Sequence, residues 1–227
     1  MNLAESLPGR QLPRERLLRH GAAVLSDSEL LAVALRTGTR GLNAIELGGQ
    51  LMQRFGGLRG LFGATPTELR AVPGLGAAKA CTLAAVLELA RRAGEEDLQR
   101  LDALSHPDRV KQYCRTALGH CTVEHCIALY LDNRLNLIAT GELARGTLAQ
   151  ACVYPREVVR EALRHHAAAL ILAHNHPSGL AQPSQADLDL TQQLRRALAL
   201  VDVKLIDHLI VAAGEVVSMA QLGMIAP

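Results

Sequence analysis

A short apolar segment that ends in two histidines constrains this chain more than any other feature. Residues 168–173 are continuously apolar, which is typical of a buried strand, and His174 and His176 follow directly. Residues i and i+2 of an extended segment point to the same side, so both imidazoles can face one point. A proline and a glycine then turn the chain.

A helix start downstream supplies a third candidate ligand. Ser184 has the character of a helix N-cap, and Asp187 lies in the first turn that would follow it. From there the Asp187 carboxylate can reach back toward the histidines. Zn²⁺ takes nitrogen and oxygen ligands in a tetrahedron, and a catalytic site uses three protein ligands plus water. The spacing therefore predicts one zinc ion bound by His174, His176 and Asp187.

Each of these residues also has a simpler interpretation. Ser184 and Asp187 alone could form a capping box without a metal, with Asp in place of the commoner Glu or Gln. A lone histidine on an apolar strand is more often a hydrogen-bonded core residue than a ligand. The coincidence of these residue types at fixed offsets favours the metal site.

Water on such a metal also needs a general base that takes its proton. The upstream carboxylates that could serve are Glu124, Asp132, Glu142, Glu157 and Glu161. Glu157 and Glu161 share a helical pattern with arginines, which is typical of a solvated helix face. Asp132 lies in a turn signal between two apolar runs. Glu142 follows a glycine at the predicted end of a strand, where another segment can come close, so it is the leading candidate.

Together these residues resemble the JAMM signature of the JAB/MPN metalloprotease superfamily, which is an upstream Glu, a His-x-His pair and a Ser-x-x-Asp segment. The matching residues are Glu142, His174, His176, Ser184 and Asp187. A longer pattern, spread over the whole chain, is similar to the RadC family in particular. Its segments are Arg36-Thr37-Gly38, Pro73-Gly74-Leu75-Gly76, Arg145-Gly146-Thr147, His174-Asn175-His176-Pro177-Ser178-Gly179, Pro183-Ser184 and Asp207-His208.

The resemblance implies a role for each residue. His174, His176 and Asp187 would bind zinc. Glu142 would deprotonate the water and then protonate the leaving amine, and Ser184 would donate a hydrogen bond to the developing oxyanion. The chemistry of the superfamily is hydrolysis of amide or isopeptide bonds, so a peptide or protein substrate is implied.

The RadC family name implies DNA repair instead. The alternative hypothesis is therefore a DNA-binding repair or recombination accessory protein whose metal domain is non-catalytic. A metal-dependent nuclease fits less well, because the common nuclease arrangement uses two metal ions. Asn175 stands where the deubiquitinating members of the superfamily carry Ser or Thr.

With 227 residues the chain is long enough for one large or two small domains. Apolar residues make up 49% and aromatic residues only 2%, so the cores must be packed from Leu, Ala and Val. No apolar run approaches a membrane span and no signal-peptide pattern is present, so we expect a soluble cytoplasmic protein. The cysteines, expected to be reduced and buried, are Cys81, Cys114, Cys121, Cys126 and Cys152.

Charge is divided unevenly along the chain. Residues 1–92 carry 12 Lys or Arg against 7 Asp or Glu, a balance of +5, whereas residues 93–227 carry 12 against 15, a balance of −3. Halves of opposite sign suggest two domains with different partners, the basic one being the candidate for DNA. Ordinary scatter in surface charge is the simpler alternative.

Residues 13–92 have the pattern of successive helices, several with capping signals. A short helix, a Gly-x-Gly turn and an Ala-rich helix resemble a helix-hairpin-helix motif. Glycines let the backbone approach a phosphate, and the next helix presents unpaired N–H groups. Gly74, Gly76 and Lys79 are therefore candidate contacts to DNA. The alternative is that the two glycines merely make a tight turn.

From about residue 109 helices and strands alternate. Helices are predicted at 109–118, 155–166 and 184–200, and strands at 126–131, 135–142, 168–173, 203–212 and 216–219. In one of these strands His208 is expected to be a hydrogen-bonded core histidine, the alternative being a group that supports the metal ligands.

We therefore expect an α+β chain of two domains joined by a linker at 93–108. Residues 1–95 would form an all-α helix-hairpin-helix bundle. Residues 105–227 would form the JAMM domain, for which the resemblance implies an MPN, cytidine-deaminase-like α/β fold with a curved mixed sheet flanked by helices.

Overall fold

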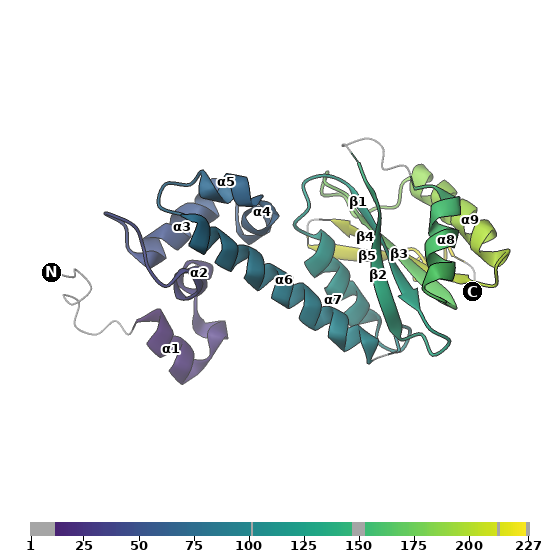
Figure 1. Cartoon of the computed structure of the whole chain (residues 1–227), viewed down its shortest axis with the longest axis horizontal. Coiled ribbons are helices and arrows are strands. Elements are labelled where there is room, and N and C mark those ends of the chain that lie inside the picture. Colours follow the sequence, from purple (N-terminus) through teal and green to yellow (C-terminus); the bar gives the residue numbers. More distant parts are fainter. Residues whose placement is uncertain (1–11, 101, 147–152, 213, 226–227) are drawn as a thin grey trace. The chain divides into compact units, whose positions relative to one another are not determined.

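The computed structural model describes residues 12–100, 102–146, 153–212 and 214–225. The chain divides into two compact units, Met1–Leu87 and Glu88–Pro227, whose elements are labelled in Figure 1. The described part of the first unit is helical, and the second contains a mixed sheet with helices on both faces, so the chain is α+β. Within the described residues no helix is both long and apolar enough to span a membrane.

The boundary between the units lies inside helix α6 (Ala77–Gln99), which enters the segment where the sequence predicts a linker. Arg91 is ion-paired with Glu88 and with Glu95, one helical turn away on either side. Such pairs stabilise a helix through a polar stretch. Leu98 is buried as well, so the helix continues to Gln99 instead of ending near Arg92.

Short capped helices build the first unit. Ser26, Asn43 and Thr65 each accept a hydrogen bond from a backbone N–H of the following helix, and a glutamate in that first turn bonds back to the cap. Fully buried leucines form the core between them, each burial contributing about 1.5–3 kcal/mol. The elements are α1 (Pro13–His20), the 3₁₀ turn η2 (Ala22–Val24), α2 (Asp27–Leu35), α3 (Ala44–Phe55), α4 (Leu58–Gly63), α5 (Pro66–Arg70) and the first part of α6.

The second unit contains a five-stranded sheet in the order β2-β1-β3-β4-β5. Only β3 and β4 are parallel, and the other neighbours are antiparallel. The strands are β1 (His125–Leu131), β2 (Leu137–Arg145), β3 (Ala169–Asn175), β4 (Lys204–Ala212) and β5 (Glu215–Ser218). Helix α7 (Pro107–Leu118) covers one face, while α8 (Pro155–Arg164) and α9 (Gln185–Ala199) cover the other (Figure 1).

Side chains alternate between the two faces of this sheet. On β1, Cys126 packs with α8 and α9, whereas Ile127 packs with α7. On β3, Leu170 and Leu172 lie on the side of α8 and α9, which we call the α8/α9 face. The same period of two directs His174 to that face.

Two strands extend beyond their predicted ends. The sequence pattern ends the third strand at residue 173, but β3 includes His174 and Asn175 because it lies between β1 and β4 and pairs with both. Similarly, β2 continues to Arg145, which pairs with His125. Pairing with a distant segment, which local hydrophobicity does not reveal, sets these ends.

The expectation of buried cysteines holds only in part. Cys114 and Cys126 are buried, and burial raises the pKa of the Cys114 thiol to about 12, so this thiol stays protonated at neutral pH. Cys81 is exposed, contrary to the prediction, and Cys121 is only partly buried. Cys152 lies outside the described residues.

Candidate metal site

Three side chains, two from the end of one strand and one from the start of a helix, converge at one end of the sheet. His174 lies near the end of β3, His176 follows that strand, and Asp187 is in the first turn of α9. Nε2 of His174 lies 2.9 Å from Nε2 of His176 and 3.1 Å from Oδ1 of Asp187, and Nε2 of His176 lies 3.4 Å from Oδ2 of Asp187. In the part of the chain that the structure describes, these are the only three His, Cys, Asp or Glu residues gathered closely enough to hold one metal ion.

The hydrogen bond that His176 makes determines which of its nitrogens is free. Its Nδ1 lies 2.8 Å from the backbone carbonyl oxygen of Leu180. A carbonyl only accepts, so Nδ1 must carry the hydrogen and donate it. The Nε2 lone pair of neutral His176 therefore faces the other two side chains, as a metal ligand requires.

The Asp187 carboxylate is the electrostatic counterpart of the two imidazoles. Burial by itself would raise the pKa of Asp187, but in the metal-free protein hydrogen bonds from the protonated rings of His174 and His176, together with their charge, hold it far below its ordinary value. Conversely, the hydrogen bond to Asp187 raises the pKa of His176 against the opposing effect of burial. Asp187 is therefore ionised at neutral pH, which is the state that binds a cation.

Ser184 serves as the N-cap of α9 and also orients Asp187. Its backbone N–H and its hydroxyl both donate to Oδ2 of Asp187, each at 2.7 Å, and its Oγ accepts from the Asp187 backbone N–H at 3.2 Å. The capping box and the convergence of Asp187 with the histidines thus occur together. Because the hydroxyl hydrogen is engaged with Asp187, donation to an oxyanion would require it to rotate.

Asn175 ties the end of β3 to the segment that precedes β1. Its side-chain oxygen accepts from the backbone N–H of His125 at 2.8 Å. Its amide nitrogen donates to the carbonyl oxygens of Val123 at 2.9 Å and Cys121 at 3.2 Å. Since Asn175 is fully buried, these bonds hold the backbone on both sides of Glu124.

Glu142 is not among the side chains that converge. It lies within β2 and not at its end, and its Oε2 is 3.4 Å from Nδ1 of His125. His125 precedes Cys126 on β1, so strand alternation directs it to the face opposite His174. Glu142 therefore contacts His125 on the face of the sheet opposite His174, and not beside the three converging side chains.

Glu124, another of the five candidate carboxylates, lies on the side of the histidines. Cys126 pairs with His174, and alternation directs Glu124, two residues earlier, to the same face. After the larger effect of the hydrogen bond to Asp187, the charge of Glu124 also helps to raise the pKa of His176.

His208 of β4 is buried against the metal group and does more than fill the core. Its Nε2 lies 2.8 Å from Nδ1 of His174, and its Nδ1 lies 2.6 Å from Oγ1 of Thr191. Burial lowers the pKa of His208 to about 3, so the ring is neutral at physiological pH. The geometry thus supports the alternative in which His208 contacts a metal ligand.

In the first unit, two of the three residues proposed to contact DNA, Gly74 and Lys79, support the turn itself. Nζ of Lys79 donates to the carbonyl oxygens of Gly38 at 2.6 Å and Gly74 at 3.3 Å. Gly74 has φ +81°, and a Cβ there would lie 2.0 Å from Cγ2 of Thr39. Lys79 and Gly74 thus have structural partners, whereas a Cβ at Gly76 would meet nothing within 4 Å.

This difference between the two glycines predicts unequal effects on stability. Gly74→Ala is expected to destabilise the first unit by about 2–4 kcal/mol, because it combines a left-handed backbone with a clash against Thr39. Gly76→Ala is the matched control and should change stability by less than about 1 kcal/mol. Urea unfolding followed by circular dichroism compares the two variants. Equal losses of stability would contradict the claim that the turn requires glycine at position 74 and not at position 76.

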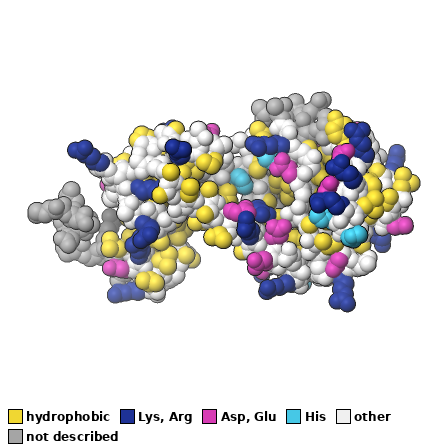
Figure 2. Space-filling view, viewed as in Figure 1, with side chains coloured by type: hydrophobic (Ala, Val, Ile, Leu, Met, Phe, Trp, Pro, Cys, Tyr) yellow, Lys and Arg dark blue, Asp and Glu magenta, His cyan; other side chains and the backbone are white. Residues whose placement is uncertain are grey.

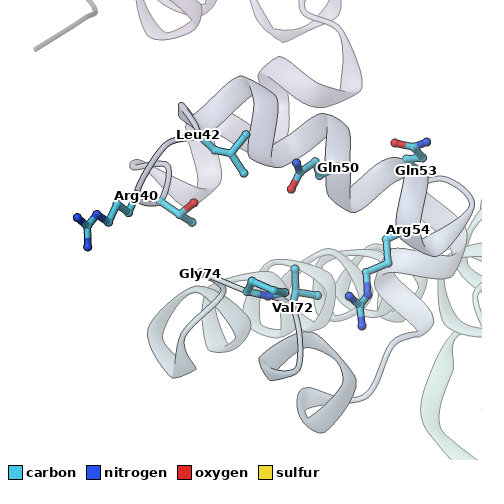
Figure 3. A pocket seen from close by; sticks show the side chains of 9 residues that line it. Arg40, Leu42, Gln50, Gln53, Arg54, Val72 and Gly74 are labelled. Atoms are coloured by element: carbon cyan, nitrogen blue, oxygen red, sulfur yellow. The ribbon is translucent and has the colours of Figure 1, made fainter.

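A cavity of about 580 Å³ adjoins the same turn. It lies between α3 and the 72–74 segment, and Figure 3 shows Gln50 and Arg54 directed into it while Arg40 extends outward from its rim. Neither arginine pairs with a carboxylate among the residues that the structure describes. The lining residues are Thr39, Arg40, Leu42, Gln50, Gln53, Arg54, Val72, Pro73 and Gly74.

Basic side chains lie over both units in the view of Figure 2, whereas most of the visible acidic ones lie over the second. This distribution agrees with the sequence: Met1–Leu87 carries 10 Lys or Arg against 6 Asp or Glu, a balance of +4, and Glu88–Pro227 carries 14 against 16, a balance of −2.

Comparison with known proteins gives matches to both parts of the chain. Residues 104–224 match a family described as "RadC-like JAB domain", and residues 5–81 match one described as "UPF0758 N-terminal". A UPF0758 protein of Bordetella petrii is 69% identical over 99% of this chain and 100% of its own length. A UPF0758 protein of Nitrosospira multiformis is 52% identical over 96% of this chain and 97% of its own length.

Proposed function

The chain belongs to the family of RadC-like JAB domain proteins, and from this premise we propose that it is a zinc-dependent hydrolase of peptide or isopeptide bonds. The observation that carries the proposal is the convergence of His174, His176 and Asp187: the two Nε2 atoms are 2.9 Å apart, and each lies within 3.4 Å of one of the two Asp187 carboxylate oxygens. Two imidazoles and a carboxylate are a donor set used by zinc hydrolases.

The geometry of these donors fits a zinc ion. Ligands bound at about 2.0 Å in a tetrahedron are separated by about 3.3 Å. Each histidine Nε2 has one Asp187 oxygen near this distance, Oδ1 for His174 and Oδ2 for His176, and one atom from each of the three residues can be chosen with all of them within 4.8 Å of one another. Because Nδ1 of His176 donates to the Leu180 carbonyl, the Nε2 lone pair of His176 is free to bind a metal. Asp187 is ionised, so its carboxylate oxygens can bind a metal as well. Bound zinc would act as a Lewis acid and lower the pKa of a water molecule to about 7.

We assign the general base to Glu124 in place of Glu142. Glu124 is on the face of the histidines and next to the segment that Asn175 holds, whereas Glu142 contacts His125 on the other face. The Glu124 carboxylate would take the proton of the attacking water and return it to the leaving amine. Ser184, after its hydroxyl rotates away from Asp187, would donate to the oxyanion.

Removal and restoration of the metal tests this proposal. A quenched-fluorescent peptide library and an isopeptide-linked peptide pair are incubated with the zinc-loaded protein, with protein stripped by a chelator, and with stripped protein given zinc again. We expect cleavage in the first and third samples alone. Cleavage that survives complete stripping would contradict a zinc hydrolase.

A second candidate function, binding of DNA through the first unit, is favoured by the cavity beside the 72–74 turn. Arg40 and Arg54 border it, none of the described residues that line it is acidic, and residues 1–92 are basic overall. Cations of this kind contact phosphates without reading sequence, so affinity should fall steeply with salt. We assign the phosphate contacts to these arginines and not to Lys79, because the Lys79 ammonium group already donates to two backbone carbonyls.

Fluorescence anisotropy with a labelled DNA duplex at low salt tests the second candidate. Arg54→Gln should weaken binding and reduce its salt dependence, whereas Arg59→Gln, which changes an arginine outside the cavity lining, should not. Absence of binding by the wild-type protein at low salt would rule out this function.

A further inference from the structure

We propose that Thr191 and His208 are positioning residues that fix the orientation and the tautomer of His174, so that its Nε2 lone pair is directed at the metal. The inference rests on the proposed metal site, and it deepens it by identifying what holds one ligand in its binding form. It follows from a chain of buried hydrogen bonds in which each hydrogen can be assigned in turn.

The first assignment comes from the backbone of α9. Oγ1 of Thr191 lies 2.5 Å from the carbonyl oxygen of Asp187, one helical turn earlier. The carbonyl can only accept, so the single hydrogen of the Thr191 hydroxyl is donated to it. The lone pairs of Oγ1 are then the groups available to a second partner.

The second assignment concerns the buried ring of His208. Its Nδ1 lies 2.6 Å from Oγ1 of Thr191, and since that hydroxyl has no further hydrogen to give, Nδ1 must donate. A neutral imidazole with hydrogen on Nδ1 has its lone pair on Nε2. The Nε2 of His208 is therefore an acceptor.

The third hydrogen bond joins His208 to His174, the proposed metal ligand. Nδ1 of His174 lies 2.8 Å from Nε2 of His208, so it is His174 that donates. With hydrogen on Nδ1, neutral His174 has its Nε2 lone pair free, and this nitrogen is the one that lies 3.1 Å from Oδ1 of Asp187. The series of hydrogen bonds therefore begins at the backbone carbonyl of Asp187, one proposed ligand, and ends at the ring of His174, another.

Because these three side chains are buried, their hydrogen bonds can hold the ring of His174 in one orientation. His174, Thr191 and His208 are each at most 3% exposed, so water has little access to replace a lost partner. The two histidine ligands are thus held by different means, because Nδ1 of His176 donates to a backbone carbonyl while Nδ1 of His174 donates to another side chain. Partners of this kind commonly affect metal affinity about 10–100-fold.

Nuclear magnetic resonance of the ring nitrogens tests the assignment in the wild-type protein. Long-range ¹H–¹⁵N spectra of the full-length, zinc-loaded chain should show His208 with its hydrogen on Nδ1 and an unprotonated Nε2, and His174 with hydrogen on Nδ1. A hydrogen on Nε2 of His208 would overturn the proposal, because His174 could then not donate to it.

Zinc affinity in two variants supplies the second measurement. Thr191→Val keeps the shape of the side chain but removes the hydroxyl, and it should weaken zinc binding about 10–100-fold in a chelator competition assay. Thr191→Ser keeps the hydroxyl and should bind close to wild type. Thermal unfolding in excess chelator shows whether both variants fold. If Thr191→Val does not fold, the ring-nitrogen spectra of the wild type decide.

The failure of this inference is distinguishable from failure of the proposed function. If the wild-type protein binds no zinc, the metal site itself is wrong. If the wild type binds zinc and folded Thr191→Val binds it equally well, the metal site stands and the role of Thr191 and His208 is overturned.

Discussion

Replacing Glu124 with Gln is expected to lower peptide or isopeptide hydrolysis by about 10²–10⁴-fold, while the zinc content of the protein stays unchanged. The amide of Gln is nearly the same size as the carboxylate but cannot take a proton from water. Because Glu124 is proposed to act on the water and not to bind the metal, zinc affinity should be close to wild type. The measurement is the cleavage rate of a peptide selected from the library with the wild-type protein, together with zinc analysis.

Glu142→Gln is the matched control for this experiment. Glu142 is on β2 and contacts His125 on the face opposite the histidine ligands, so its loss should leave most of the rate intact. The reverse pattern, with activity lost in Glu142→Gln and kept in Glu124→Gln, would restore Glu142 as the base and contradict our assignment.

The Asp187→Asn variant should lose more than about 100-fold in zinc affinity, beyond the range seen when a supporting group is changed. Asn keeps an oxygen that can accept from Ser184, so the cap of α9 should survive while the negative charge disappears. The control is Asp189→Asn on the same helix, an exposed residue whose carboxylate bonds only Gln185 among the described residues. Chelator competition compares the two, and equal affinities would contradict the ligand role.

The same two variants also test whether Asp187 makes the stability of the protein depend on pH. Because the pKa of Asp187 is held below its ordinary value of about 3.9, its ionised form stabilises the zinc-free fold above that pH. This stability is lost as the pH falls toward the folded-state pKa. Asp187→Asn should therefore flatten the acid limb of a plot of unfolding free energy against pH, whereas Asp189→Asn should leave it close to wild type.

The convergence of the three candidate metal ligands could be predicted from the sequence because their geometry is local. His174 and His176 are two residues apart at the end of one strand, and Ser184 and Asp187 share one helical turn. Strand alternation and capping chemistry then determine which side chains can meet. The strand that precedes them and the helix that follows were predicted to within a few residues for the same reason.

The carboxylate could not be chosen in the same way. Whether Glu124 or Glu142 faces the histidines depends on which residue of β1 pairs with His174, and this register joins segments about 50 residues apart. A shift of one residue would exchange the two faces. The hydrophobic pattern identifies the strands but does not give their register.

The supporting residues left weaker signals. Thr191 lies one helical turn after Asp187 and so on the same side of α9, which would have suggested it as a neighbour. His208 becomes a partner of His174 only through the parallel pairing of β3 with β4, in which its own register partner is Leu172. In the first unit, the Gly-x-Gly pattern indicated a turn correctly, but the contacts of Lys79 with carbonyl groups required the structure.

The most direct measurement of the central claim is the zinc stoichiometry of the purified full-length protein, determined by inductively coupled plasma mass spectrometry after dialysis. We predict about one zinc ion per chain in the wild type and in His106→Ala, which changes an exposed histidine away from the three ligands, and almost none in His174→Ala. Equal zinc in His174→Ala and the wild type, or no zinc in the wild type after reconstitution, would contradict the metal site on which this account rests.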